Sequence, residues 1–255
     1  LGFEDVPGAD TIWTVEDGET LTPDTPVTLR WDNDNGLIFR REISVDDNYM
    51  FTIDQSVENT GTDSVTMQPY GIISRHGEPA DLKNFFILFE GAMMMNDGTL
   101  EEFKYKALRN LDNVPREGAP AEVVSVGNAG WTGFTDHYWM TMLIPDDGTP
   151  YTQVAKYYEN RDVYETQTRL ATETIGAGER VTVSSRLFAG AKEWATIREY
   201  QQQGVIKFID SIDWGWFFFL TKPIFWLLHQ MNIFIGNMGW SIIALTLVLK
   251  AILFP

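Results

Sequence analysis

The sequence has 255 residues, and its 36 acidic side chains against 19 basic ones give a net charge of −17 at neutral pH. Such a charge repels phosphate groups, so we predict that no nucleic acid binds this region. The absence of cysteine excludes disulfides, thiolate metal sites and cysteine nucleophiles. All of the net negative charge lies in residues 1–200, which favours the outer side of a membrane for this part of the chain.

Residues 1–188 have the pattern of a large antiparallel β-sandwich, so the predicted fold is mainly β. Short alternating segments are separated by turn signals such as Asn35-Gly36. Their spacing, with about ten strands, is typical of such a sandwich. The predicted strands are Pro26–Trp31, Leu37–Val45, Tyr49–Val57, Val65–Ile73, Asn84–Phe89, Leu100–Tyr105, Val123–Val126, Tyr138–Ile144, Tyr164–Leu170 and Val181–Phe188.

Little in the sandwich predicts catalysis. A histidine, His76 or His137, and a carboxylate of the same domain could act as acid and base on a sugar, but such a pairing is expected by chance in so acidic a chain. We interpret His137 as a surface or strand residue. Four aspartates lack the spacing of a Ca²⁺ loop and indicate solvated turns: Asp32, Asp34, Asp46 and Asp47. We therefore predict a protein that is not an enzyme and has neither metal nor cofactor.

Residues 189–213 are predicted to connect the sandwich to a membrane. Within 189–203 the spacing of Trp194, Ile197 and Tyr200 favours a short helix.

Residues 214–236 are predicted to form an amphipathic helix that lies in the membrane interface. Aromatic side chains are typical of the headgroup level of a bilayer. The alternatives are a membrane-crossing helix and a core helix of a larger domain. The predicted interface residues, including one from the next segment, are Trp214, Trp216, Phe217, Trp226 and Trp240.

Residues 237–255 are predicted to be the first part of a transmembrane helix that the end of the chain truncates, since a span needs about 20 apolar residues. If Trp240 marks the interface, Lys250 lies about 15 Å deeper, near the middle of the hydrocarbon. Thr246 shares its helix face. Charged residues at such depth usually face a watery cavity or a partner. The alternative is that Lys250 snorkels to the far interface.

Several motifs in the chain resemble those of a known family. They are Phe134-Thr135-Asp136-His137-Tyr138-Trp139, Lys222-Pro223-Ile224-Phe225, Gly236-Asn237-Met238-Gly239-Trp240-Ser241-Ile242-Ile243 and Lys250-Ala251-Ile252-Leu253-Phe254-Pro255. They resemble the periplasmic domain, interfacial helix and first core helix of YidC/Oxa/Alb insertases of the Gram-negative YidC type.

The resemblance implies a β-supersandwich similar to mutarotase and sugar-binding folds, placed in the periplasm and attached to the bacterial inner membrane. It implies an insertase or chaperone for nascent membrane proteins that acts in the lipid bilayer, alone or with the Sec translocon and its accessory subunits. It also implies a hydrophilic intramembrane groove, in which Lys250 takes the position of the family's usual arginine and Thr246 that of a polar neighbour.

The alternative function is a membrane-anchored periplasmic sugar-binding or mutarotase-like module. It predicts a sandwich groove with aromatic side chains and paired acid and base groups. A purely structural assembly factor is a third possibility. Neither of these gives a reason for a lysine within an apolar helix.

Overall fold

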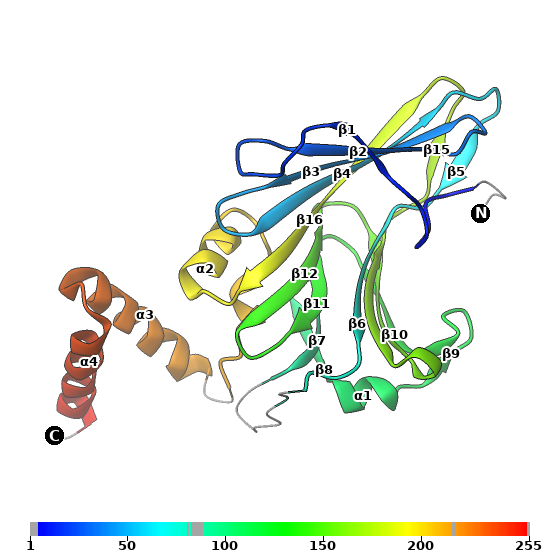
Figure 1. Ribbon diagram of the computed structural model, residues 1–255. Coiled ribbons are helices and arrows are strands. Elements are labelled where there is room, and N and C mark those ends of the chain that lie inside the picture. Colours follow the sequence, from blue (N-terminus) through cyan, green and yellow to red (C-terminus); the bar gives the residue numbers. More distant parts are fainter. Residues whose placement is uncertain (1–4, 81, 83–88, 216–217, 254–255) are drawn as a thin grey trace. The chain divides into compact units, whose positions relative to one another are not determined.

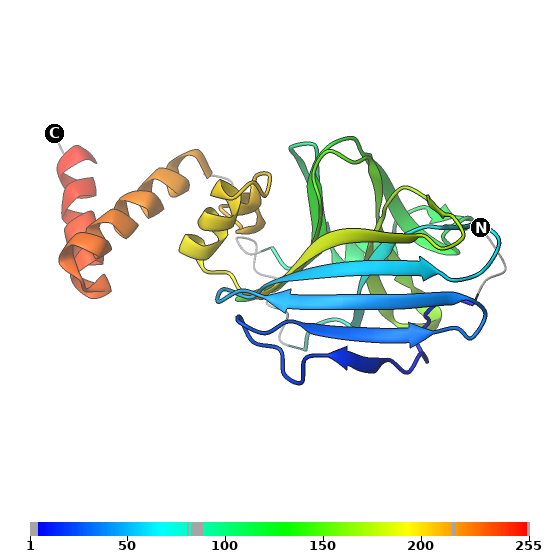
Figure 2. The same cartoon turned by 90° about the horizontal axis from the view of Figure 1, so that it is seen from above.

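The structure is a computed structural model that describes residues 5–80, 82, 89–215 and 218–253. It divides into two units, which are treated separately below. The first is a β-sandwich that ends at Ser211, and the second is a helical unit that begins at Ile212. The prediction of a mainly β, antiparallel sandwich followed by short helices is confirmed (Figures 1 and 2).

The larger sheet of the sandwich has nine antiparallel strands in the order β1-β2-β3-β4-β16-β12-β11-β7-β8. In that order the strands are Thr14–Asp17, Val27–Asp32, Leu37–Val45, Met50–Asn59, Arg180–Ala191, Trp139–Pro145, Gly130–Thr135, Gly91–Asn96 and Thr99–Lys104. The last long strand, β16, therefore lies in the middle of the sheet between β4 and β12.

A second antiparallel sheet has five strands in the order β6-β14-β13-β10-β9. These are Tyr70–His76, Val163–Arg169, Tyr151–Tyr158, Ala119–Val126 and Asn113–Val114. A small sheet pairs β15 (Glu173–Ile175) with β5 (Val65–Met67). A helix, α1 (Tyr105–Arg109), follows β8, and a 3-10 turn, η1 (Glu159–Arg161), joins β13 to β14.

The core between the two large sheets is built from side chains of β7, β11, β13, β14 and α1. Tyr105 and Tyr164 meet edge to face with ring centroids 4.9 Å apart, which is a favourable geometry for aromatic pairs. The buried cluster consists of Ala92, Met94, Tyr105, Leu108, Phe134, Ala155, Tyr157 and Tyr164. Burial of these apolar side chains is the main force that holds the two sheets together.

A second aromatic cluster fastens the connector to the sandwich. The connector contains α2 (Trp194–Gln202) and a 3-10 turn, η2 (Phe208–Ser211). The ring of Phe208 lies 5.7 Å from Phe188 in β16 and 5.8 Å from Trp131 in β11. Trp131 is fully buried, and its Nε1 donates a hydrogen bond to the carbonyl of Ile206 at 2.9 Å. The expected short helix is thus part of the sandwich unit rather than a free linker.

Some strands differ from those predicted. Val65–Ile73 is divided into β5 and β6 on either side of Gln68 and Pro69, because proline has no N–H to give to a sheet. Residues 84–88 of the predicted strand Asn84–Phe89 lie outside the described residues, and Phe89 is not in a strand. Six observed strands had no predicted counterpart: β1, β7, β9, β11, β13 and β15.

The helical unit is a pair of packed helices, α3 (Phe218–Ile235) and α4 (Met238–Leu253). Gly236, with φ +71°, ends α3 in the left-handed conformation that glycine tolerates best. Asn237 then caps α4, because its Oδ1 accepts a hydrogen bond from the backbone N–H of Trp240 at 3.2 Å. In the described part of the chain, no helix is both long enough and apolar enough to cross a membrane.

Candidate functional site

The predicted groove residues lie together on one side of α4. Ser241 and Leu245 are buried, whereas Thr246 and Lys250 are exposed. At 3.6 residues per turn, the pair Thr246 and Lys250 lies on the side opposite to Ser241 and Leu245. The helix therefore presents one cation and one hydroxyl away from its buried side.

Thr246 and Lys250 have different capacities for binding. The Thr246 hydroxyl donates to the carbonyl of Ile242 at 2.8 Å, one turn earlier. Its oxygen can still accept a hydrogen bond. The Lys250 ammonium has three donors and a full charge. Together they offer an electrostatic partner for a carboxylate and an acceptor for a polar N–H or O–H group.

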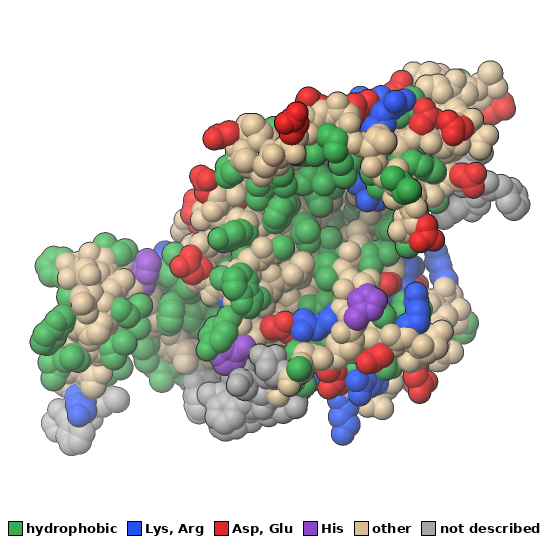
Figure 3. Space-filling model, viewed as in Figure 1, with side chains coloured by type: hydrophobic (Ala, Val, Ile, Leu, Met, Phe, Trp, Pro, Cys, Tyr) green, Lys and Arg blue, Asp and Glu red, His purple; other side chains and the backbone are tan. Residues whose placement is uncertain are grey.

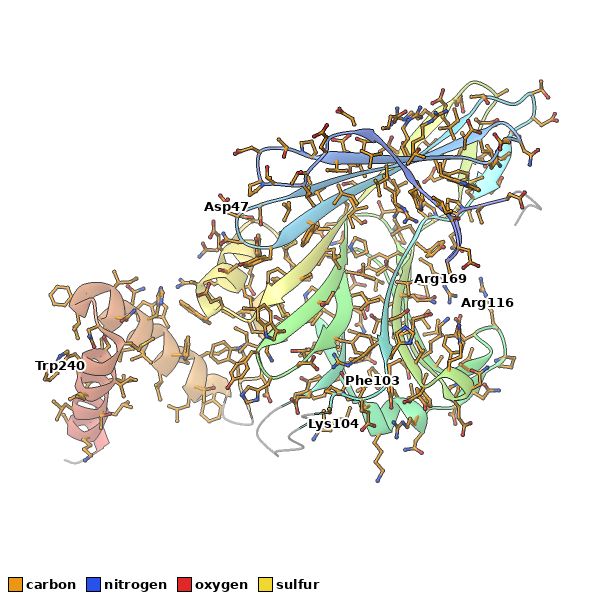
Figure 4. The ribbon with its side chains drawn as sticks, viewed as in Figure 1. Asp47, Phe103, Lys104, Arg116, Arg169 and Trp240 are labelled. Atoms are coloured by element: carbon orange, nitrogen blue, oxygen red, sulfur yellow. The ribbon has the colours of Figure 1, made fainter. Side chains whose placement is uncertain are left out.

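The described aromatic residues of the predicted interface are largely exposed. Trp226 is 45% and Trp240 is 65% exposed, which leaves both rings available to a bilayer. Figure 4 shows Trp240 projecting from the start of α4. Trp214 packs edge to face on Phe225 at 5.7 Å. Trp216 and Phe217 lie outside the described residues.

Three polar side chains of α3, those of Thr221, His229 and Asn232, are half-buried. The exposed side is instead mostly apolar, with Phe219, Trp226, Ile233 and Phe234. Figure 3 shows the hydrophobic side chains spread over the helical unit. A helix with this distribution needs apolar surroundings on its outer side.

The sandwich also has a groove, which the sugar-binding alternative predicts. Its volume is about 360 Å³, and it lies between the β3-β4-β16 part of the large sheet and the small β15-β5 sheet. Its lining is mainly apolar, and Arg41 stacks over Trp13 at 4.5 Å on one side. Among the described residues no histidine lines this groove.

Asp136, which precedes His137 in the chain, is held by partners other than that histidine. Asp136 accepts hydrogen bonds from Arg75 at 2.7 Å and from the Tyr105 hydroxyl at 3.4 Å, so its carboxylate is already held. Burial and the nearby charge of Asp136 raise the pKa of Tyr105, which therefore stays protonated. The ring of His137 lies against Tyr138 at 3.9 Å. The carboxylate thus fixes a turn in the sandwich.

Two of the four aspartates that were interpreted as turn residues, Asp32 and Asp46, act as local caps. Asp32 Oδ1 accepts the backbone N–H of Asp34 at 3.0 Å. Asp46 Oδ1 accepts the N–H of Asn48 at 2.8 Å, and both oxygens of Asp46 accept the hydroxyl of Tyr200 from α2. These contacts tie the β3–β4 turn to the connector helix.

Sequence reasoning missed a buried cluster of charges on β13 and β14. Lys156 is 4% exposed, and its Nζ lies 3.3 Å from carboxylate oxygens of both Glu117 and Glu165. Arg169 adds a two-pronged ion pair to Glu117. Its hydrogen bond holds the pKa of Glu117 below its usual value. The cluster has two positive and two negative charges, which lets Lys156, Glu117 and Glu165 be buried beside the half-buried Arg169.

Comparison with known proteins shows the family to which the chain is similar. A family model described as the YidC periplasmic domain matches residues 2–227. A relative from Dinoroseobacter shibae is 61% identical over 256 residues, covering 100% of this chain and 42% of that protein. One from Ruegeria pomeroyi is 59% identical over 260 residues, covering 100% of this chain and 43% of that protein. Both are named "Membrane protein insertase YidC".

Among solved structures, the sandwich is similar to a galactose mutarotase related enzyme from Lactobacillus acidophilus. The TM-score is 0.50 at 10% sequence identity, over 72% of this chain and 74% of that one. At this identity the likeness shows a shared fold and nothing about activity.

The sandwich and its apolar helical unit define a membrane-associated protein with a periplasmic β-domain. The chain belongs to the YidC family, as the resemblance of its motifs predicted. Its two relatives are named as insertases and not as enzymes. The chain spans about two fifths of the length of these relatives.

Proposed function

We propose that this chain is the periplasmic domain and the start of the membrane core of an insertase in the bacterial inner membrane. Its substrates are nascent membrane proteins, which it helps to insert and fold, alone or beside the Sec translocon and its accessory subunits. In this scheme residues 1–188 are the periplasmic domain, 189–213 the connector, 214–236 the interfacial helix and 237–255 the beginning of a core transmembrane helix.

The observation that carries the proposal is the side of α4 that presents Thr246 and Lys250. A lysine on the exposed side of an apolar helix is costly in lipid unless its charge meets water or a partner. Both residues point away from the buried side of α4, where Ser241 and Leu245 lie. That leaves them available to line a groove with further helices of the complete protein.

The mechanism is physical and breaks no covalent bond. A polar or acidic segment of a substrate must cross a hydrocarbon layer about 30 Å thick, where unpaired polar groups are costly. Lys250 attracts such a segment electrostatically, and Thr246 accepts a hydrogen bond from it. The apolar helix of the substrate then leaves the groove for the lipid, and the burial of its apolar surface drives the step.

The sugar-binding alternative receives less support. The sandwich groove has the aromatic Trp13 and Tyr70, as that alternative predicts, but its Arg40 is already engaged by carboxylates outside the groove. Arg40 pairs with Glu16 at 2.7 Å and with Glu58 at 2.6 Å. The sugar-binding alternative also gives no role to Thr246 and Lys250 on α4.

Site-specific photo-cross-linking in the complete protein tests the proposal. A photoreactive residue at Thr246 is expected to capture a ribosome-bound, single-span nascent chain during insertion. The matched control is the neighbouring Leu245, which is 8% exposed on the buried side of the same helix. Equal capture at both positions, or capture at Leu245 alone, would contradict the assignment of this side of α4 to the substrate.

A further inference from the structure

Three exposed aromatic residues lie at one end of the large sheet, and together they form what we call the aromatic tip. Tyr49 is 58%, Tyr138 is 69% and Trp139 is 62% exposed. Tyr49 ends the β3–β4 turn, Tyr138 ends the β11–β12 turn, and Trp139 begins β12. Side chains of this size and exposure contribute little to the core, so their position at the same end of the sheet calls for another explanation.

The tip is held together by the end of β16. The backbone N–H of Ala189 donates to the carbonyl of Tyr49 at 3.2 Å, and that of Lys192 donates to the carbonyl of Tyr138 at 2.8 Å. Trp139 is paired with Ala191. Because β4 and β12 flank β16, the two turns lie about 10 Å apart across the sheet, which is twice the usual strand spacing.

Both turns are anchored by side-chain contacts to neighbouring elements. Asp46 anchors the first turn through Tyr200 of α2 at 2.7 Å. Figure 4 shows the neighbouring Asp47 at this turn, close to α2. Asp136 anchors the second turn through Arg75 at 2.7 Å. Rigid aromatic groups lose little conformational entropy when they contact a partner.

Tyr49 also sits in an unfavourable backbone conformation. Its φ is +70°, in the left-handed region that glycine and asparagine occupy more easily than a bulky residue. Such a conformation is strained for a residue with a Cβ atom. Gly190 leaves the space for this tyrosine, since a Cβ atom there would lie 3.0 Å from the Tyr49 Cβ. The fold thus accommodates an exposed aromatic ring where a small residue would fit better.

We propose that the aromatic tip contacts the surface of the lipid bilayer and inserts its rings at the headgroup level. Tyrosine and tryptophan concentrate at that level because each ring has an apolar body and a polar group. The exposed charged residues beside the tip include the acidic Asp47 and Glu193. An acidic border does not fit attraction to anionic lipid, so the contact depends on the rings and is insensitive to salt.

The short segment that connects the sandwich unit to α3 makes this contact possible. Only six residues, 212–217, separate Ser211 of the sandwich unit from Phe218, the first residue of α3. An extended segment of that length spans at most about 25 Å. If α3 lies in the bilayer interface, as the proposed function requires, the sandwich is held close to the same surface. The inference rests on the proposed function in this respect.

Lipid-attached quenchers test the inference in the complete protein, reconstituted in phosphatidylcholine vesicles. A fluorophore is attached to Asn48→Cys, an exposed turn position that leaves all three rings intact. The matched control is Asn35→Cys at the β2–β3 turn. It lies at the far end of β3, whose nine residues extend about 30 Å. A third label at Gln230→Cys in α3 reports whether that helix meets the bilayer.

We expect quenching by headgroup-level lipid quenchers at position 48 to be several-fold stronger than at position 35 and to persist at high salt. Combined replacement of Tyr49, Tyr138 and Trp139 by serine is expected to remove the difference without changing the circular dichroism spectrum. Equal quenching at 48 and 35, with strong quenching at 230, would overturn the inference and leave the proposed function intact. Weak quenching at all three positions would overturn both the inference and the proposed function. Loss of access for aqueous quenchers at 48 without lipid quenching would overturn the inference in favour of a protein partner.

Discussion

Replacement of Lys156 by methionine tests the role of the buried charge cluster in the periplasmic domain. Methionine is similar to lysine in length and removes only the ammonium group. The Lys156 Nζ lies 3.3 Å from oxygens of Glu117 and Glu165. Burial lowers the pKa of Lys156, but its contacts with Tyr158 and Glu165 outweigh this effect, and the net shift is upward. The lysine is therefore charged at neutral pH, and the substitution removes a buried positive charge.

The size of the effect follows from the geometry. At 3.3 Å each contact is worth about 5 kcal/mol of Coulomb energy with an effective dielectric constant of about 20, before the cost of burial is subtracted. Breaking a buried ion pair typically costs 3–5 kcal/mol, because the partner is left buried without compensation. Arg169 continues to neutralise Glu117. We therefore expect a loss of about 3 kcal/mol in the free energy of unfolding, the lower end of that range.

Urea unfolding of the detergent-solubilised protein, followed by pulse proteolysis of the sandwich, measures this loss. Lys106→Met is the matched control, since Lys106 is exposed on α1 and its replacement is expected to change stability by less than about 0.5 kcal/mol. Adding Glu165→Gln to Lys156→Met is expected to restore part of the stability, because it removes the uncompensated charge. If Lys156→Met costs no more than Lys106→Met, the cluster does not stabilise the sandwich and the reasoning is refuted.

Two further predictions concern the same domain. Gly133→Ala is expected to cost about 3 kcal/mol in the same assay, because its Cβ would lie 1.9 Å from the carbonyl oxygen of Thr141. That oxygen cannot move without disturbing the β11–β12 pairing. Gly8→Ala is the control, since no atom would lie within 4 Å of its Cβ, and equal effects of the two substitutions would refute the steric argument. The lowered pKa of Glu117 predicts that stability is retained above its ordinary pKa of 4.5 and is lost as the pH falls through the lower folded value. Glu117→Gln should flatten this part of the stability-versus-pH curve, and an unchanged curve would contradict the assignment.

The strands that sequence patterns predicted well are those with one solvent-facing side. Leu37–Val45 and the hairpin before it alternate clearly, and the turn is fixed locally by Asn33, whose Oδ1 accepts the N–H groups of Asn35 and Leu37. Three of the strands that were missed, β7, β11 and β13, lie in the interior of the two large sheets. Gly91–Asn96 is buried on both faces, so it shows no alternation of polar and apolar residues.

Tertiary packing explains the other misses. Gly130–Thr135 contains two glycines, which lower strand propensity. In the fold, Cβ atoms at Gly130 and Gly133 would lie 2.0 and 1.9 Å from backbone oxygens of the adjoining strands, so glycine is required at both positions. Lys156 was unremarkable in the sequence because its two carboxylate partners are 39 and 9 residues away and meet it only after folding.

The common helix side of Thr246 and Lys250 was easier to predict than the missed strands, because it depends on local periodicity alone. A spacing of four residues places Thr246 and Lys250 on one side of any helix. The half-buried polar residues of α3 could not be predicted in this way, since their burial depends on what packs around that helix. Periodicity gives the relative direction of side chains, and packing decides which direction faces a neighbour.

The dependence of substrate insertion on the charge at position 250 tests the central claim most directly. The complete protein is reconstituted in liposomes with a single-span substrate that has an acidic translocated segment. Parent, Lys250→Arg and Lys250→Ala proteins are then compared. The account predicts that arginine preserves insertion, since it keeps the charge, and that alanine lowers it. Equal insertion by all three proteins would contradict an electrostatic role for Lys250.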